Sequence, residues 1–124
     1  MEKTHSFKDL IVWQKAHQLV IAIYKATKLF PKEEVFSLTN QVRRAAVSIA
    51  ANICEGYKKK TIPNQLNFIN IAEGSLEEVK YYIILSKDLQ YINEKDFEQL
   101  TNAAEEVGRL INGYEKAISK RLTP

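Results

Sequence analysis

Only a few side chains in this sequence have the chemistry of a catalyst or a metal ligand near neutral pH. They are His5, His17 and Cys54. The histidines stand twelve residues apart and do not pair on adjacent helical turns, whereas a zinc site needs three or four ligands at workable spacing. Cys54 has no recognisable base or oxyanion pocket, and no glycine-rich phosphate loop is present. The sequence therefore predicts a non-enzymatic protein with no catalytic residue, no metal and no cofactor.

A polar stripe at helical spacing is the most unusual pattern in the chain. Gln41, Arg44, Ser48, Asn52 and Glu55 recur at steps of three and four, which aligns them on one face of a helix. A solvated helix face usually mixes several Lys and Glu, but this stripe carries mainly short amide and hydroxyl groups. Such groups build hydrogen-bond networks or line a cavity. Two interpretations stay open: a polar seam between helices or subunits, and a channel that contacts a ligand or nucleic acid.

Cations bracket the same segment, with an aromatic residue beside them. The group consists of Arg43, Arg44, Tyr57, Lys58, Lys59 and Lys60. The cations could meet phosphates, and the tyrosine could stack on a base. A lysine triplet is also typical of a solvated helix C-terminus, because cations suit the negative end of the helix dipole. The group is a candidate nucleic-acid site with this simpler structural alternative.

The charge is distributed unevenly along the chain. Residues 7–60 hold ten Lys or Arg and four Asp or Glu, a net charge of +6. Residues 61–124 hold seven basic and ten acidic residues, a net charge of −3. A basic half beside an acidic half indicates either a face that binds a polyanion or complementary surfaces that pair between copies.

Four amphipathic segments position these residues. Apolar residues recur at steps of three and four in each, and in the first segment they include Trp13, Ala16, Val20, Ile23 and Thr27. The predicted helices cover about residues 7–30, 37–58, 63–91 and 94–121. Because the connections are short, consecutive helices are expected to lie antiparallel. The sequence predicts an all-α, up-down-up-down four-helix bundle.

Local signals mark the helix ends. Ser6 with Asp9 resembles a capping box, and Asn93 resembles a second cap. Pro63 is favoured in the first turn of a helix. Gly56 is expected to end the second helix in a left-handed cap.

Two apolar runs contain more apolar side chains than a monomeric four-helix bundle can bury. Tyr81–Leu85 places apolar or aromatic groups all the way round the third helix, and Ile11–Trp13 does the same on the first. A few exposed aromatic residues are common in monomers. Contiguous exposed apolar patches are usually occupied, so we expect a subunit interface.

Composition sets the broad class. The 124 residues predict a single domain over residues 1–124, with 45% hydrophobic and 27% charged residues. Four Gly and three Pro are too few for the turns of an all-β domain of this size. The lone cysteine fits a reducing compartment, and neither an apolar signal-peptide core nor a membrane-length apolar run is found. We expect a cytoplasmic protein without a membrane partner.

The second helix carries a specific family resemblance. Its sequence reads Gln41-Val42-Arg43-Arg44-Ala45-Ala46-Val47-Ser48-Ile49-x-x-Asn52-Ile53-x-Glu55-Gly56. This string resembles the four-helix-bundle proteins encoded within intervening sequences of bacterial 23S ribosomal RNA genes, over about residues 7 to 118. The chain is similar, more distantly, to the accessory variability determinant of diversity-generating retroelements. Cys54 departs from the family pattern, in which alanine is common.

The resemblance implies a bundle that assembles into a ring of five, with a basic surface that meets RNA or DNA and no enzymatic activity. It implies that Arg43 and Arg44 are candidate nucleic-acid contacts. Two functions follow as hypotheses: a homo-oligomeric nucleic-acid-binding protein, and a structural or adaptor ring that binds a protein partner and uses its basic half for assembly.

Overall fold

The chain forms four α-helices, and no strand is present between residues 5 and 122, the part that the computed structural model describes. Residues 1–4 and 123–124, which the predicted domain includes, lie outside this part. The helices are α1 (Ile11–Thr27), α2 (Leu38–Tyr57), α3 (Ile62–Asp88) and α4 (Glu94–Ser119). Short 3₁₀ turns are η1 (Phe7–Asp9), η2 (Lys32–Glu34) and η3 (Lys120–Leu122). The all-α prediction with four helices is confirmed.

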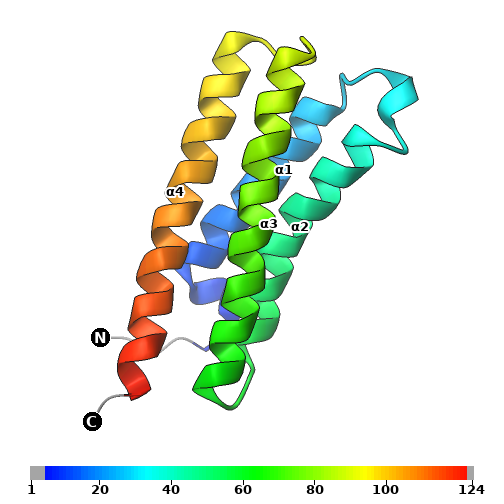
Figure 1. The fold of residues 1–124 in the computed structure, drawn as a ribbon. Helices are drawn as coiled ribbons and strands as arrows, with labels where there is room; N and C mark the ends of the chain where they lie inside the picture. The colour runs from blue at the N-terminus through cyan, green and yellow to red at the C-terminus, as the bar shows by residue number, and fades with distance from the viewer. Residues whose placement is uncertain (1–4, 123–124) are drawn as a thin grey trace.

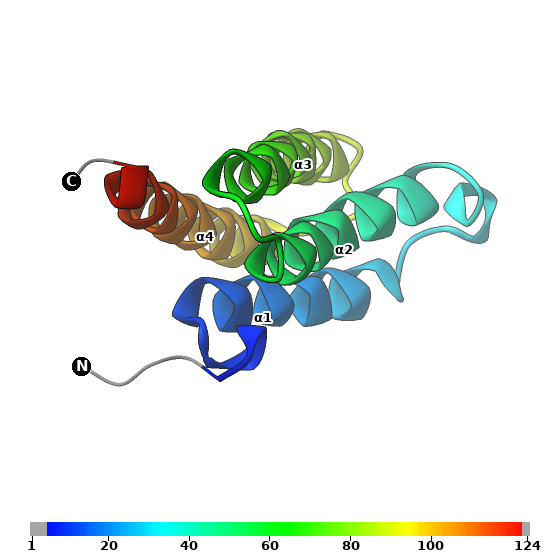
Figure 2. The same cartoon turned by 90° about the horizontal axis from the view of Figure 1, so that it is seen from below.

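The helices run antiparallel to their neighbours in sequence (Figure 1). Contacts join α1 with α2, α2 with α3, α3 with α4, and α4 back to α1, so the four helices surround one core. The connection between α1 and α2 stands out to one side of the bundle in both views (Figures 1 and 2).

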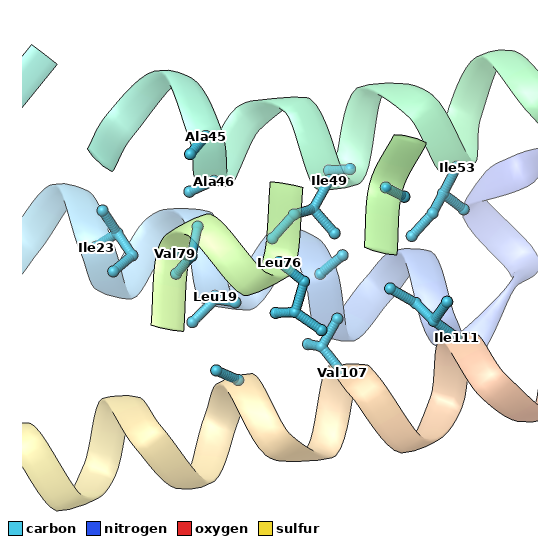
Figure 3. Close-up of a cluster of buried hydrophobic side chains, with 14 of the residues drawn as sticks. Leu19, Ile23, Ala45, Ala46, Ile49, Ile53, Leu76, Val79, Val107 and Ile111 are labelled. Atoms are coloured by element: carbon cyan, nitrogen blue, oxygen red, sulfur yellow. The ribbon is translucent and has the colours of Figure 1, made fainter. Parts of the chain in front are cut away.

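All four helices contribute to the core (Figure 3). The apolar residues of α2 that recur at steps of three and four are all buried: Leu38, Val42, Ala45, Ile49 and Ile53. The stripe of α1 is displaced from the prediction, because Val12 and Leu19 are buried in place of Trp13 and Val20, which pack at the edge of the core.

Helix α1 is shorter at both ends than predicted. The capping box of Ser6 and Asp9 is present, but it closes the turn η1 and not the α-helix. Leu10 then adopts an extended conformation (φ −75°, ψ 123°), which interrupts the helical hydrogen bonds before α1 begins. The Asn93 cap is confirmed: its side chain accepts a hydrogen bond from the Asp96 amide at 2.8 Å.

The start of α3 has a proline that the sequence analysis expects and an N-cap residue that it does not. Pro63 lies in the first turn, as predicted, where a missing N–H costs nothing. Thr61 is the N-cap, and its hydroxyl accepts a hydrogen bond from the Asn64 amide at 3.3 Å.

The predicted left-handed cap at Gly56 is wrong. Gly56 lies inside α2, and no glycine among the described residues has a positive φ. The glycine is instead required by close packing, because a Cβ there would lie 2.9 Å from Phe68 Cβ. The left-handed cap occurs after α3, where Gln90 has φ 65° and the Tyr91 amide donates to the Ser86 carbonyl in a Schellman motif.

Candidate nucleic-acid interface

The polar stripe of α2 faces α3 of the same chain. The Ser75 hydroxyl donates to Ser48 Oγ at 2.8 Å. The Asn52 amide donates to Ser48 Oγ at 3.0 Å and to the Ser48 carbonyl at 2.8 Å. The Ser75–Ser48 bond crosses between the helices and the Asn52 bonds stay within α2, which together form a polar seam between two helices otherwise joined by apolar packing.

A hollow of about 400 Å³ opens at the start of this seam, between α2 and α3. The Tyr82 hydroxyl lies 2.9 Å from Gln41 Oε1 and 3.2 Å from Glu78 Oε2, within hydrogen-bond reach of both. Burial raises the pKa of Tyr82, and the Glu78 carboxylate adds to this rise. Arg44 lines the hollow and is exposed. Glu55, the last member of the predicted stripe, is exposed further along α2.

Arg43 is tied to α1, although it was predicted alongside Arg44. Its Nε donates to the Thr27 hydroxyl at 2.8 Å, and Nη2 donates to the Tyr24 carbonyl at 3.4 Å. Its guanidinium also lies 4.6 Å from the centre of the Tyr24 ring. Arg43 is therefore a structural link as well as a cation.

The lysine triplet lies at the opposite end of α2 from the arginines. Lys58 and Lys60 are exposed, while Lys59 places its Nζ 4.8 Å from the centre of the Phe68 ring. Tyr57 is half-buried. Because a helix rises about 1.5 Å per residue, the two groups of cations are separated by about 20 Å and do not form one cluster.

The cations on α2 and directly after it differ from Lys15, Lys80 and Lys87 in their electrostatic partners. Lys15, Lys80 and Lys87 form ion pairs with carboxylates of α3 and α4 at 3.2 to 3.5 Å. Within residues 5–122, no ion pair involves the group that we call the α2 cations: Arg43, Arg44, Lys58, Lys59 and Lys60. Their positive charge is not neutralised by a carboxylate of residues 5–122.

The side chains with catalytic potential do not come together. The His17 ring stacks on Trp13 with centroids 5.1 Å apart, and Cys54 is half-buried. Across the described range, no three His, Cys, Asp or Glu side chains lie close enough to hold a metal ion. A carboxyl pair joins α3 and α4, where the hydrogen bond between Glu73 and Glu115 raises the pKa of Glu73 to about 7. Spacing along the sequence does not predict this pair, because its members are 42 residues apart.

A basic hollow that was not predicted from the sequence lies between the end of α1 and the start of α2, and its lining includes Lys28, Lys32 and Arg43. A signal for it exists in the sequence. Lys25, Lys28 and Lys32 follow steps of three and four, which extends a basic face from α1 into the connection.

The predicted apolar runs are only partly exposed. On α3, Tyr81 and Ile84 are exposed by 57% and 49%, whereas Ile83 is buried in the core. Ile11 is exposed and Val12 is buried. No helix in residues 5–122 combines the length and apolar character needed to cross a membrane.

Comparison with protein families matches residues 8–113 to the family described as "23S rRNA-intervening sequence protein". The chain belongs to this family. A similar fold occurs in the crystal structure of a protein with unknown function from the S23 ribosomal protein family of Bacteroides thetaiotaomicron, with a TM-score of 0.79 and 26% sequence identity. The similarity covers 86% of this 23S rRNA-intervening sequence protein and 99% of the Bacteroides chain. A comparison with curated proteins gives no match.

Proposed function

We propose that this 23S rRNA-intervening sequence protein is a non-enzymatic, cytoplasmic, homo-oligomeric protein that contacts RNA or DNA through the α2 cations. The observation that carries the proposal is the absence of ion pairs between these five cations and any carboxylate in the described part of the chain. Cations that lack a carboxylate partner within the protein retain their attraction for phosphates. Three other lysines of the same chain, Lys15, Lys80 and Lys87, pair with its acidic half.

The exposed members of the group fit contact with a phosphate backbone. Arg44 on α2 and Lys58 and Lys60 directly after its end are exposed, and Arg44 lies about 20 Å along the helix from the two lysines. Successive phosphates of one strand lie several ångströms apart, so cations at separate positions on a rigid surface can contact separate phosphates. Contacts of this kind position a nucleic acid without reading its sequence.

The homo-oligomeric part of the proposal is supported by the outer face of α3. Tyr81 and Ile84, one helical turn apart on this face, are large apolar side chains exposed by 57% and 49%. Burying this face against a second copy would remove apolar surface from water. The ring of five implied by the family resemblance is the assembly that we propose.

A direct test compares two triple variants. Arg44→Ala, Lys58→Ala and Lys60→Ala removes three charges from the proposed interface, and Lys95→Ala, Arg109→Ala and Lys116→Ala removes three exposed charges from α4. Fluorescence anisotropy with a structured RNA and a matched DNA duplex measures affinity at low salt. We expect the first variant to bind at least about tenfold more weakly than the second. Equal affinities would exclude the α2 cations as the binding surface.

A second candidate is a structural or adaptor ring, favoured by the exposed apolar residues of α3. In that case the α2 cations serve assembly, and the first triple variant should lower the sedimented mass. An unchanged mass in sedimentation velocity would count against this candidate.

A further inference from the structure

The basic hollow between α1 and α2 has the size of a small-molecule site. Its volume is about 670 Å³, within the roughly 300–1,000 Å³ range of such sites. It lies where the α1–α2 connection stands out from the bundle (Figure 2). Its lining includes Lys28, Lys32, Phe36, Thr39, Asn40 and Arg43, and no carboxylate is among its lining residues in the described structure.

The three cations of the hollow come from three different elements. Lys28 follows α1, Lys32 begins η2, and Arg43 lies on α2. Arg43 is held in place by Thr27 and Tyr24, so its guanidinium is fixed before any ligand arrives. In residues 5–122 none of the three cations forms an ion pair. This arrangement concentrates positive charge in one concave place, which attracts phosphate.

The rim of the hollow supplies an aromatic surface. The Phe36 side chain is 94% exposed, and it also borders the α2–α3 hollow. An exposed aromatic ring beside cations offers a face on which a nucleobase can stack. In the wall, the buried Thr39 Oγ1 has no hydrogen-bond partner among the described residues.

The neighbouring α2–α3 hollow is less suited to phosphate. Arg44 is the cation in its lining, and Glu78 lies beside it. A carboxylate repels a phosphate and weakens the attraction of the single arginine. The α1–α2 hollow combines three cations with an aromatic rim and has no such carboxylate.

We infer that the α1–α2 hollow binds one nucleotide unit, with its phosphate held by Lys28, Lys32 and Arg43 and its base stacked on Phe36. The inference rests on the proposed function and deepens it by naming a site away from Arg44 and the lysine triplet. The unit has two sources, a free nucleotide or one nucleotide of an RNA strand. Both present the same phosphate and base.

The test uses the full chain and two fluorescent probes, N-methylanthraniloyl-ATP and a fluorescein-labelled single-stranded RNA. The variants are Lys28→Ala with Lys32→Ala, and separately Phe36→Ala. All three side chains are exposed, so the fold should survive, which circular dichroism checks. Lys95→Ala with Lys116→Ala is the charge-matched control. Arg43 is left intact because it joins α1 to α2.

We expect the double lysine variant to lose at least about tenfold in affinity for a probe that the control still binds. Phe36→Ala should lose about fivefold or more, because base stacking is removed. Binding of the ATP probe identifies a free-nucleotide site, and binding of the RNA alone identifies a strand site.

Three results would overturn the inference. Wild-type protein that binds RNA with unchanged affinity in both variants would remove the hollow from the site and leave the α2 cations in place. Wild-type protein that binds neither probe would contradict the proposed function as well. If Phe36→Ala lowers the sedimented mass and leaves binding unchanged, the rim is a contact with a second copy of the chain.

Discussion

The Nε atom of Arg43 donates a hydrogen bond to the Thr27 hydroxyl at 2.8 Å, which ties α2 to α1. The side chain of Arg44, the next residue, forms no hydrogen bond or ion pair within the described part of the chain and is exposed. Two adjacent arginines therefore differ in role. The first stabilises the bundle and lines the α1–α2 hollow, and the second is available to a partner.

Replacing each arginine by alanine should separate these roles. Arg43→Ala removes hydrogen bonds from a charged donor and a cation–π contact with Tyr24, so we expect a loss of about 1–3 kcal/mol in the free energy of unfolding. Arg44→Ala should change it by no more than about 0.5 kcal/mol. Urea denaturation measures both. Equal losses would contradict the assignment.

Two glycines should respond to alanine in opposite directions. A Cβ at Gly56 would lie 2.9 Å from Phe68 Cβ, so Gly56→Ala must push α2 and α3 apart and should cost about 1–3 kcal/mol. Gly74 in α3 has no atom within 4 Å of the added Cβ, and Gly74→Ala should stabilise by about 0.5–1 kcal/mol. Thermal unfolding followed by circular dichroism gives the sign of each change. A tolerated alanine at Gly56 would refute the close approach.

The seam between Ser48 and Ser75 should appear as an energetic coupling. In a double-mutant cycle of Ser48→Ala and Ser75→Ala, we expect a coupling of about 0.5–1.5 kcal/mol, because the two hydroxyls bond each other at 2.8 Å. Ser86, which lies on α3 like Ser75, donates its hydroxyl instead to the Tyr82 carbonyl. A cycle of Ser48→Ala with Ser86→Ala is therefore the control, with no coupling expected. Equal couplings in both cycles would argue against a specific bond.

Stability should depend on pH through the Glu73–Glu115 pair. Their hydrogen bond, with burial and charge repulsion, raises the pKa of Glu73 from 4.5 to about 7. Between these values the folded state binds more protons than the unfolded state, so stability decreases as pH rises through this window. Glu73→Gln keeps the hydrogen bond without the titration. We expect its melting temperature to equal that of the wild type near pH 5 and to exceed it near pH 8; parallel pH profiles would contradict this.

The fold follows from patterns that are local in sequence. The spacing of Val42, Ile49 and Ile53 identifies the face of α2 that packs in the core. The Asn93 cap and Pro63 identify the starts of α4 and α3. The ends of α1 and the role of Gly56 depend on other information. Leu10 adopts an extended conformation, and Phe68 of α3 leaves no room for a side chain at position 56. The spacing of apolar residues along the sequence predicts neither feature.

The sequence predicts which residues belong to the candidate site, but it does not predict which residues they contact. The sequence places Arg43 and Arg44 together, but the packing of α1 against α2 decides that only Arg43 meets Thr27. Likewise, Ser48 was expected on a polar stripe, and the pairing of α2 with α3 supplies Ser75. Such partners come from tertiary contacts between distant segments.

The central claim is that the α2 cations bind phosphates, and a salt titration of the wild-type protein tests it most directly. Anisotropy of a labelled structured RNA and of a matched DNA duplex would be followed with nuclease-treated protein from low to physiological salt. We predict binding at micromolar protein or tighter, with the logarithm of the association constant falling steeply with the logarithm of salt, by about 0.9 for each phosphate neutralised on duplex DNA. No binding at low salt, or binding that is independent of salt, would contradict the claim and leave the basic half of the chain as an assembly surface.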